Sequence, residues 1–324
     1  MPIPRSMIFS PRMLRTAGVC AFALCLGAAH AQGAQELIAK GDSLLGEGKP
    51  QRALDYFEKA IIADASAPSY LGRARAWYLL DRMDRFLTDV EKALRLDSSS
   101  AEAHYQRGLY ALRAEDPYKA EYHAGKAINH SEDAKLRAHA HILRGDALAE
   151  LNHNDRAIVE FESGLAKGVD DPLAMRTLAR LYDGTGRHAD ALALLEKLCV
   201  LEPQDVGHWT NRGFELIMLE RYAEALPMVE HALEIDKDEP VALSNRAYVF
   251  MKMDRDKEAW SDVERSLKSF PANAHALRTR ALLRLRKGER EKACEDLGVA
   301  KALGDVPEVD QLLKEHCGGP PMAR

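Results

Sequence analysis

The chain has 324 residues, of which 46% are hydrophobic and 29% are charged, and its formal net charge is -5. This composition can bury a large core, which excludes an intrinsically disordered chain. Without residues 1–31, 42 basic and 50 acidic residues remain. That acidic balance provides no electrostatic footprint for nucleic acid, so we expect no nucleic-acid partner.

Residues 1–31 predict a cleaved export signal. Three arginines precede an uncharged apolar run, residues 17–29, and the segment ends in the small-x-small pattern Ala29-His30-Ala31 before Gln32. The run is shorter than the roughly 20 residues that a membrane-spanning helix needs. Cleavage near Ala31-Gln32 predicts a periplasmic or secreted protein without membrane insertion. The alternative is an uncleaved N-terminal anchor.

A pattern of small residues recurs eight times along the rest of the chain. Each copy holds a small residue, a second, usually alanine, 12 positions later and a third 7 positions after that. Successive copies are offset by 33, 34, 37, 34, 34, 34 and 34 residues. Such a period indicates one supersecondary unit stacked on copies of itself. The copies begin at Gly41, Ala74, Gly108, Gly145, Ala179, Gly213, Ala247 and Ala281.

Each unit is predicted to contain two antiparallel helices. In the sixth unit, residues 206–219 carry Trp209, Gly213 and Leu216 on one helical stripe, and a second helix follows the turn at 220–222. Small residues at a helix crossing let the two backbones approach closely. Glycine inside a helix costs about 1 kcal/mol relative to alanine, so its return at this position predicts a packing role.

This pattern resembles the tetratricopeptide repeat family over residues 34–305. The resemblance implies an all-α fold, a right-handed superhelical solenoid of about eight helix-turn-helix repeats with a C-terminal capping helix. Position 24 of each repeat is apolar as the family expects, whereas its proline at position 32 occurs only as Pro203 and Pro271. Within a solenoid of residues 32–305, the repeats are expected near 34–66, 67–100, 101–134, 138–171, 172–205, 206–239, 240–273 and 274–305.

Residues 306–317 are expected to form the capping helix that covers the apolar face of the last repeat, and residues 318–324 a flexible tail. If the cap folds back antiparallel, Cys294 and Cys317 each lie about 15 Å from the turn between the helices and therefore side by side. An oxidising compartment then permits a disulfide that holds the cap. Two buried free thiols are the alternative. Cys199 would remain unpaired, as a thiol of the core.

Gly41-Asp42-Ser43-Leu44 spells the signature of the GDSL hydrolases, and residues 205–208 imitate their Asp-x-x-His. The family's serine lies on an exposed loop after a strand, whereas Ser43 falls inside a predicted helix with Gly41 at the packing position. We therefore expect no catalytic residue and no enzyme activity. A hydrolase that uses Ser43 is the alternative.

Six of the twelve histidines fall between His104 and His153. His139 and His141 are two residues apart and point to different faces of a helix, and no His-Glu-x-x-His or Cys-x-x-Cys pattern occurs. We expect no metal site and no cofactor. A histidine metal centre is the alternative.

Arginine recurs at position 7 of six repeats. At about 100° per residue, position 7 points toward the neighbouring helix layer rather than to the free face. We therefore predict that these arginines pack their stems and pair with acids, instead of forming a cationic ladder for a ligand. They are Arg73, Arg107, Arg144, Arg212, Arg246 and Arg280.

The resemblance implies that first helices line a concave groove, with position 9 facing it. At this position the last four repeats carry Arg180, Phe214, Tyr248 and Leu282, unlike the first four. The surroundings loosely resemble the carboxylate clamp of chaperone-binding members, although Val241 and Asn245 replace its expected lysine and arginine. Two arginines one turn apart can hold a carboxylate, asparagines can satisfy an extended backbone, and aromatic rings anchor side chains. The predicted peptide-binding groove is Arg176, Arg180, Asn211, Phe214, Asn245, Tyr248 and Leu282.

The sequence thus predicts a non-enzymatic scaffold or adaptor of the cell envelope that binds a protein or peptide segment in its groove. The alternatives are an ordinary helix surface with incidental aromatics, self-association through a terminal repeat, and a hydrolase or metal-dependent enzyme built on the solenoid. No residue pattern identifies the partner.

Overall fold

The structure, a computed structural model, describes residues 32–166, 168–304 and 306–318. These residues form helices joined by short turns, with no strand among them. The predicted export signal, residues 1–31, and the predicted tail beyond residue 318 lie outside the described residues. Within the described ranges, no helix is both long and apolar enough to cross a bilayer.

The chain divides into two compact units, the first ending at Val169 and the second beginning at Asp170. Unit 1 opens with a helix over residues 32–46. It continues with α2 (Pro50–Ala63), α3 (Ala67–Leu79), α4 (Met83–Leu96), α5 (Ala101–Arg113), α6 (Pro117–His130), α7 (Ala134–Glu150) and α8 (Asn154–Leu165).

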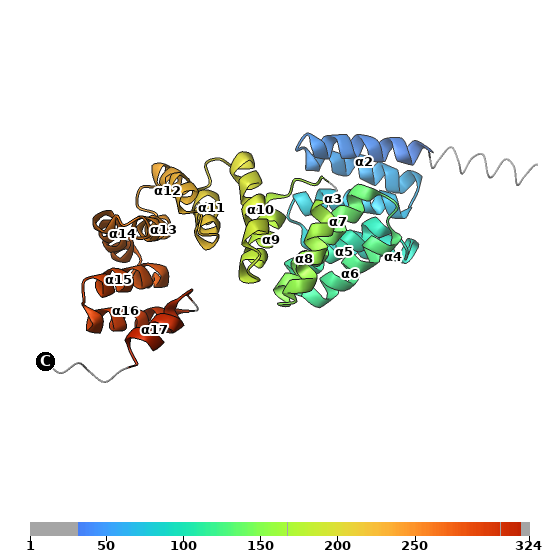
Figure 1. Cartoon of the computed structure of the whole chain (residues 1–324). Coiled ribbons are helices and arrows are strands. Elements are labelled where there is room, and N and C mark those ends of the chain that lie inside the picture. Colours follow the sequence, from blue (N-terminus) through green and yellow to red (C-terminus); the bar gives the residue numbers. More distant parts are fainter. Residues whose placement is uncertain (1–31, 167, 305, 319–324) are drawn as a thin grey trace, which may run out of the picture. The chain divides into compact units, whose positions relative to one another are not determined.

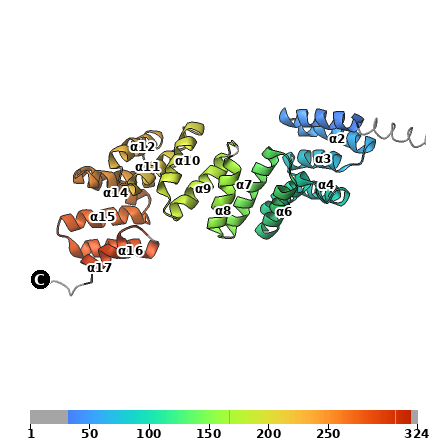
Figure 2. The same ribbon diagram turned by 45° about the vertical axis from the view of Figure 1, so that its right-hand side comes forward.

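Unit 2 begins with four helices, α9 (Pro172–Gly184), α10 (His188–Leu201), α11 (Val206–Met218) and α12 (Tyr222–Ile235). It ends with α13 (Pro240–Lys252), α14 (Asp256–Ser269), α15 (Ala274–Arg286), α16 (Arg290–Leu303) and α17 (Val309–His316). In both units each helix packs against the next one along the chain, and α13 also contacts α11 and α15 (Figures 1 and 2). The predicted all-α helical repeat is therefore confirmed.

The small-residue pattern is the helix-packing surface of every repeat. All of its residues are buried, including Phe86, which replaces alanine in the second repeat. A Cβ at Gly41 would lie 2.6 Å from the Phe57 ring, and one at Gly145 would lie 3.0 Å from the Phe161 ring. Glycine recurs at this position because an apolar side chain, from the second helix or at Gly108 from Leu143 of the next repeat, fills the space that a methyl group would take.

The turn inside each repeat contains one residue with a left-handed backbone. These residues follow one another at offsets of 33, 34, 37 and then 34 residues, the period of the small-residue pattern. Glycine adopts this conformation at no steric cost, whereas most other residues are strained in it. The eight residues are Gly48, Asp81, Glu115, Asn152, Gly186, Glu220, Asp254 and Gly288.

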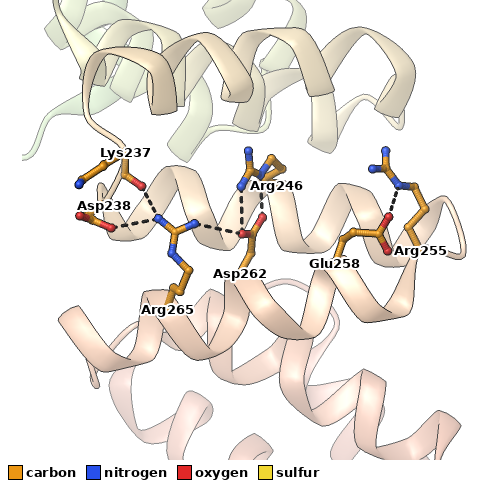
Figure 3. A network of polar contacts seen from close by, with 7 residues as sticks. All are labelled: Lys237, Asp238, Arg246, Arg255, Glu258, Asp262 and Arg265. Atoms are coloured by element: carbon orange, nitrogen blue, oxygen red, sulfur yellow. Dashed lines mark hydrogen bonds and ion pairs between the residues drawn. The ribbon is translucent and has the colours of Figure 1, made fainter.

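The arginines at position 7 pair with acids on neighbouring helices, as predicted. Arg246 in α13 donates two hydrogen bonds, of 2.6 and 3.0 Å, to Asp262 in α14 (Figure 3). Arg73 and Arg280 form the same bidentate pair with an aspartate 16 residues further along. Arg107, Arg144 and Arg212 lie 3.2–3.9 Å from glutamates. These side chains are therefore part of the scaffold.

The last helix, α17, covers the end of unit 2. Val309 and Leu312 on its inner face are buried against Leu297 and Ala300 of α16. A disulfide joins Cys294 to Cys317, with their Cα atoms 5.7 Å apart. Cys199 is a buried free thiol, and burial raises its pKa. The side-by-side placement expected of Cys294 and Cys317 is thus present, and the pairing left open by the sequence is a bond.

Candidate functional site

The side chains of α9 and α11 enclose a pocket of about 460 Å³ in unit 2. Four of the seven residues predicted to form a groove line it, namely Arg176, Arg180, Asn211 and Phe214. They occupy positions 5, 6 and 9 of two consecutive repeats, so the repeat period places them on facing helix surfaces. We refer to this cavity as the α9–α11 pocket.

One edge of the α9–α11 pocket is cationic. Arg180 is exposed, and its guanidinium forms no hydrogen bond or ion pair with any described residue. Arg176, one turn earlier, is 45% exposed and lies 3.9 Å from Asp205, its one ion-pair partner in the described part of the chain. Unlike the arginines of position 7, Arg180 is therefore available to a ligand carboxylate, and Arg176 lies one turn away in a long, exposed ion pair.

The other helix contributes an amide and an aromatic ring. Asn211 is exposed, and Phe214 is half-buried. The Phe214 ring packs edge-to-face against His275 of α15, with the ring centroids 5.6 Å apart. The pocket therefore combines two guanidinium groups, a free amide and a rigid apolar surface.

The pocket also contains two carboxylates that share one histidine. His188 Nδ1 lies 2.9 Å from Glu215 Oε2 and 3.5 Å from Asp183 Oδ1. Burial raises the pKa of Glu215 to about 7, although the hydrogen bond to His188 opposes this shift, and burial also raises the pKa of Asp183. The carboxyl side of the pocket can therefore hold a proton near neutral pH and present a donor as well as an acceptor.

Two clusters in unit 2 have the donor set of a divalent-cation site. Asp183, His188 and Glu215 form one, and Glu202, Asp205 and His208 form the other, with ligand atoms within 4.8 Å of one another in each. The second cluster also has a structural role, because Asp205 caps the N-terminus of α11 and Glu202 accepts a hydrogen bond of 2.7 Å from His208. The first set comes from three helices and has no sequence signature, whereas the second lies within residues 202–208.

The other three predicted groove residues lie outside this pocket. Asn245 is buried and donates a hydrogen bond to the Thr210 carbonyl at 3.3 Å. Tyr248 is also buried, and its hydroxyl donates to Glu308 at 3.0 Å. Leu282 is half-buried between two apolar clusters. First helices pack closely here and Glu308 contacts Tyr248, so positions 6 and 9 are not open surface in the seventh repeat.

Residues of the GDSL-like motif serve helix packing. Ser43 lies within the helix over residues 32–46, beside the buried Gly41. Asp205 and His208, in the other unit, form the N-cap turn of α11, where the His208 amide donates to Asp205. No nucleophile on an exposed turn is formed by these residues.

Three histidines of unit 1, His104, His123 and His130, interact with one another. His104 Nδ1 lies 3.0 Å from His123 Nδ1, and the rings of His104 and His130 stack at 6.0 Å. Burial lowers the pKa of His123 to about 4. His141 pairs with Glu160 at 2.8 Å. Among the described residues of unit 1, no metal-ligand cluster of three His, Cys, Asp or Glu side chains forms.

Unit 1 holds a larger pocket, of about 840 Å³, which position 9 alone did not reveal. Tyr78 at position 12 and Tyr105 at position 5 line it together with His139. Its arginine, Arg75, is neutralised by Asp42 at 2.6 Å and Glu102 at 3.3 Å. Positions 5 and 12 of the first repeats, considered beside position 9, would have indicated this second aromatic surface.

Comparison with known proteins agrees with this architecture. A tetratricopeptide repeat family model matches residues 38–101 and 142–206. The tetratricopeptide repeat and J domain-containing co-chaperone DNJ1 of Cryptococcus neoformans var. grubii serotype A is 28% identical over 132 residues. That match covers 40% of this chain and only 24% of the relative.

Two solved structures share the fold. The first is YrrB, described as a TPR protein with an unusual peptide-binding site, which has a TM-score of 0.50 and 24% identity. That match covers 58% of this chain and 95% of YrrB. PilW, described as a widely conserved type IV pilus biogenesis factor, has a TM-score of 0.53 and 18% identity, and covers 63% of this chain and 93% of PilW. At these identities the likeness concerns the fold alone.

Proposed function

Because the chain is a tetratricopeptide repeat protein, we propose that it is a non-enzymatic interaction scaffold that binds an acidic peptide segment in the α9–α11 pocket. Arg180 and Arg176 hold a carboxylate of the ligand. Asn211 bonds its backbone, and Phe214 contacts a neighbouring apolar side chain.

The observation that carries this proposal is the state of Arg180. An exposed guanidinium that forms no ion pair with a described residue stands one turn from Arg176 and beside an aromatic ring. The arginines of position 7, by contrast, are held by acids of their own or adjacent repeats. The scaffold therefore has no structural use for the Arg180 charge, and a partner carboxylate supplies its counter-ion.

A displayed library of random peptides, selected on the purified protein, tests the proposal. We expect the enriched peptides to contain an acidic residue next to an apolar or aromatic one. Arg180→Glu and Phe214→Ala should each weaken a selected peptide at least tenfold, about 1.4 kcal/mol. Arg52→Glu is the matched control, because it reverses an exposed charge in α2 of the other unit.

Two results would count against the site. Selected peptides without an acidic preference would remove the role of the arginines. Equal binding by Arg180→Glu and Arg52→Glu would place the peptide elsewhere, with the pocket of unit 1 as the next candidate.

We also propose that the protein functions outside the cytoplasm, in the cell envelope or beyond it. The support is the predicted export signal together with the Cys294–Cys317 disulfide, because such bonds persist in oxidising compartments. Fractionation of cells that express the full chain tests this, with N-terminal sequencing of the exported form. A form that begins at Gln32 is expected, whereas an intact N-terminus in the cytoplasmic fraction would refute the proposal.

A further inference from the structure

A second anion-binding arrangement lies at the end of unit 2, under residues 306–317, which we call the cap. Tyr248 and Lys252 of α13 and Arg278 of α15 all approach one carboxylate, that of Glu308 in the cap. The Tyr248 hydroxyl donates to Glu308 Oε2 at 3.0 Å. Lys252 Nζ lies 3.7 Å from Oε1 and Arg278 lies 4.0 Å from Oε2.

Arg278 is a buried cation beside this carboxylate. Its side chain is 6% exposed, and its guanidinium stacks over the Tyr248 ring at 4.1 Å. One amino group donates to the Pro307 carbonyl at 3.4 Å, while its Nε is buried and has no hydrogen-bond partner among the described residues. A buried charge costs free energy unless it is paired, so Arg278 requires an anion on the side where Tyr248 and Lys252 also lie.

Glu308 supplies that anion at a conformational cost. Its backbone is left-handed, with φ 68° and ψ -17°, a region that glycine adopts freely and glutamate does not. Its side chain remains 41% exposed, so the carboxylate enters from the solvent side. Glu308 thus contacts this site from the solvent side, as a bound ligand would, and is not itself part of the core.

The space beside this carboxylate is lined by apolar side chains together with charged ones such as Arg286 and Glu315. A pocket of about 300 Å³ adjoins Lys252 and Glu308 and is lined by Leu282, Leu285 and Leu312, among others. A peptide with an acidic side chain flanked by an apolar one fits this combination. The disulfide and the buried Val309 and Leu312 hold α17 itself, so exchange of one carboxylate for another needs movement only of the segment around Glu308.

We propose that Tyr248, Lys252 and Arg278 form a second carboxylate subsite for a peptide ligand, and that Glu308 occupies it as an internal ligand which the partner displaces. The inference rests on the proposed function, since it extends peptide binding to the other end of unit 2. It also accounts for the burial of Tyr248, which the sequence placed on the open groove. The internal carboxylate lowers the apparent affinity for a partner by the fraction of molecules in which the subsite is filled.

The test uses fluorescent capped peptides of the sequence Ala-Leu-Glu-Leu-Ala, its Gln counterpart and an Ala-Leu-Ala-Leu peptide with a free C-terminal carboxylate. Fluorescence anisotropy measures their binding to the full-chain wild type and to Glu308→Gln. Removal of the internal charge should tighten the Glu peptide on the order of tenfold and leave the Gln peptide unchanged. The free-carboxylate peptide shows whether a chain terminus or a side chain is the better ligand.

Tyr248→Phe in the Glu308→Gln background is the companion variant, because it removes one donor and keeps the ring that Arg278 stacks on. It should abolish the gain. Asp310→Asn, which removes an exposed cap carboxylate outside this pocket, is the matched control and should give no gain. Equal affinity of wild type and Glu308→Gln for the Glu peptide would overturn the inference. The proposed function fails separately, through Arg180→Glu in the α9–α11 pocket.

Discussion

Arg246 and Asp262, which stand 16 residues apart on two helices of the same repeat, are joined by two side-chain hydrogen bonds (Figure 3). Asp262 is only 5% exposed, so loss of the arginine would leave its carboxylate buried with a weaker partner, Arg265 at 3.8 Å. The neighbouring pair of Arg255 and Glu258 is exposed on both sides.

We therefore expect Arg246→Ala to lower the free energy of unfolding by about 2–3 kcal/mol, and Arg255→Ala by less than about 0.5 kcal/mol. Urea denaturation followed by circular dichroism measures both. A loss for Arg246→Ala as small as that for Arg255→Ala would mean that the position-7 pairs add little to the stability of the scaffold.

Gly164→Ala should destabilise unit 1 more than other glycine substitutions. A Cβ at Gly164 would lie 2.9 Å from the Ala138 carbonyl oxygen and 3.2 Å from the Ile142 nitrogen, and backbone cannot rotate away. We expect a loss of about 2–3 kcal/mol. Gly125→Ala is the control, because a Cβ there meets no described atom within 4 Å beyond its own helix backbone. It should stabilise by up to about 1 kcal/mol. Thermal denaturation of the two variants checks the opposite signs.

Glu115→Gly should stabilise the chain, although it shortens a surface side chain. Glu115 occupies the left-handed turn position with φ 56°, where three other repeats have glycine. Glycine relieves this backbone strain but has a greater conformational entropy in the unfolded chain. The net gain in the free energy of unfolding is about 0.5–1 kcal/mol. Asn152→Gly is the comparison, since asparagine tolerates the same conformation better and should gain less. A destabilised Glu115→Gly would show that the turns are not strained.

Acidification from pH 7 to 4 should weaken unit 2 through His275. Burial lowers the pKa of His275 from its ordinary 6.5 to about 4. Between these values the unfolded chain binds more protons than the folded one, so the free energy of unfolding falls as the pH falls. We expect a contribution of about 2 kcal/mol after allowance for partial exposure.

His275→Leu should flatten this dependence because it removes the titrating group. The substitution leaves no group unpaired, since Nδ1 of His275 is buried without a described hydrogen-bond partner. His231→Gln, at a side chain that is 39% exposed, is the control. Urea titrations at several pH values compare the slopes, and parallel curves for wild type and His275→Leu would contradict the prediction.

The repeat period predicted the scaffold because packing at a helix crossing depends on side-chain size, which the sequence states directly. Gly41 and Ala53 are buried where the spacing places them, and Arg246 pairs as its helical angle requires. The groove was predicted less completely, since four of its seven predicted residues, including Arg180 and Phe214 at position 9, line the α9–α11 pocket.

The parts of the site that the sequence did not predict depend on contacts between segments that are not separated by the repeat period. Tyr248 is covered by Glu308, 60 residues later and beyond the last repeat, so its own position could not reveal its burial. Likewise Asp183, His188 and Glu215 meet from three helices, at three different repeat positions. The repeat period predicts the direction in which a side chain points, but not which other segment packs against it.

The pairs formed by Arg73, Arg246 and Arg280 with Asp89, Asp262 and Asp296 each lie inside a single repeat. A stretch of gene that encodes one such repeat therefore encodes both charges. Duplication or deletion of the whole stretch leaves neither member of this pair without the other. Recombination of these repeats as whole units can thus change the length of the chain without loss of the pair.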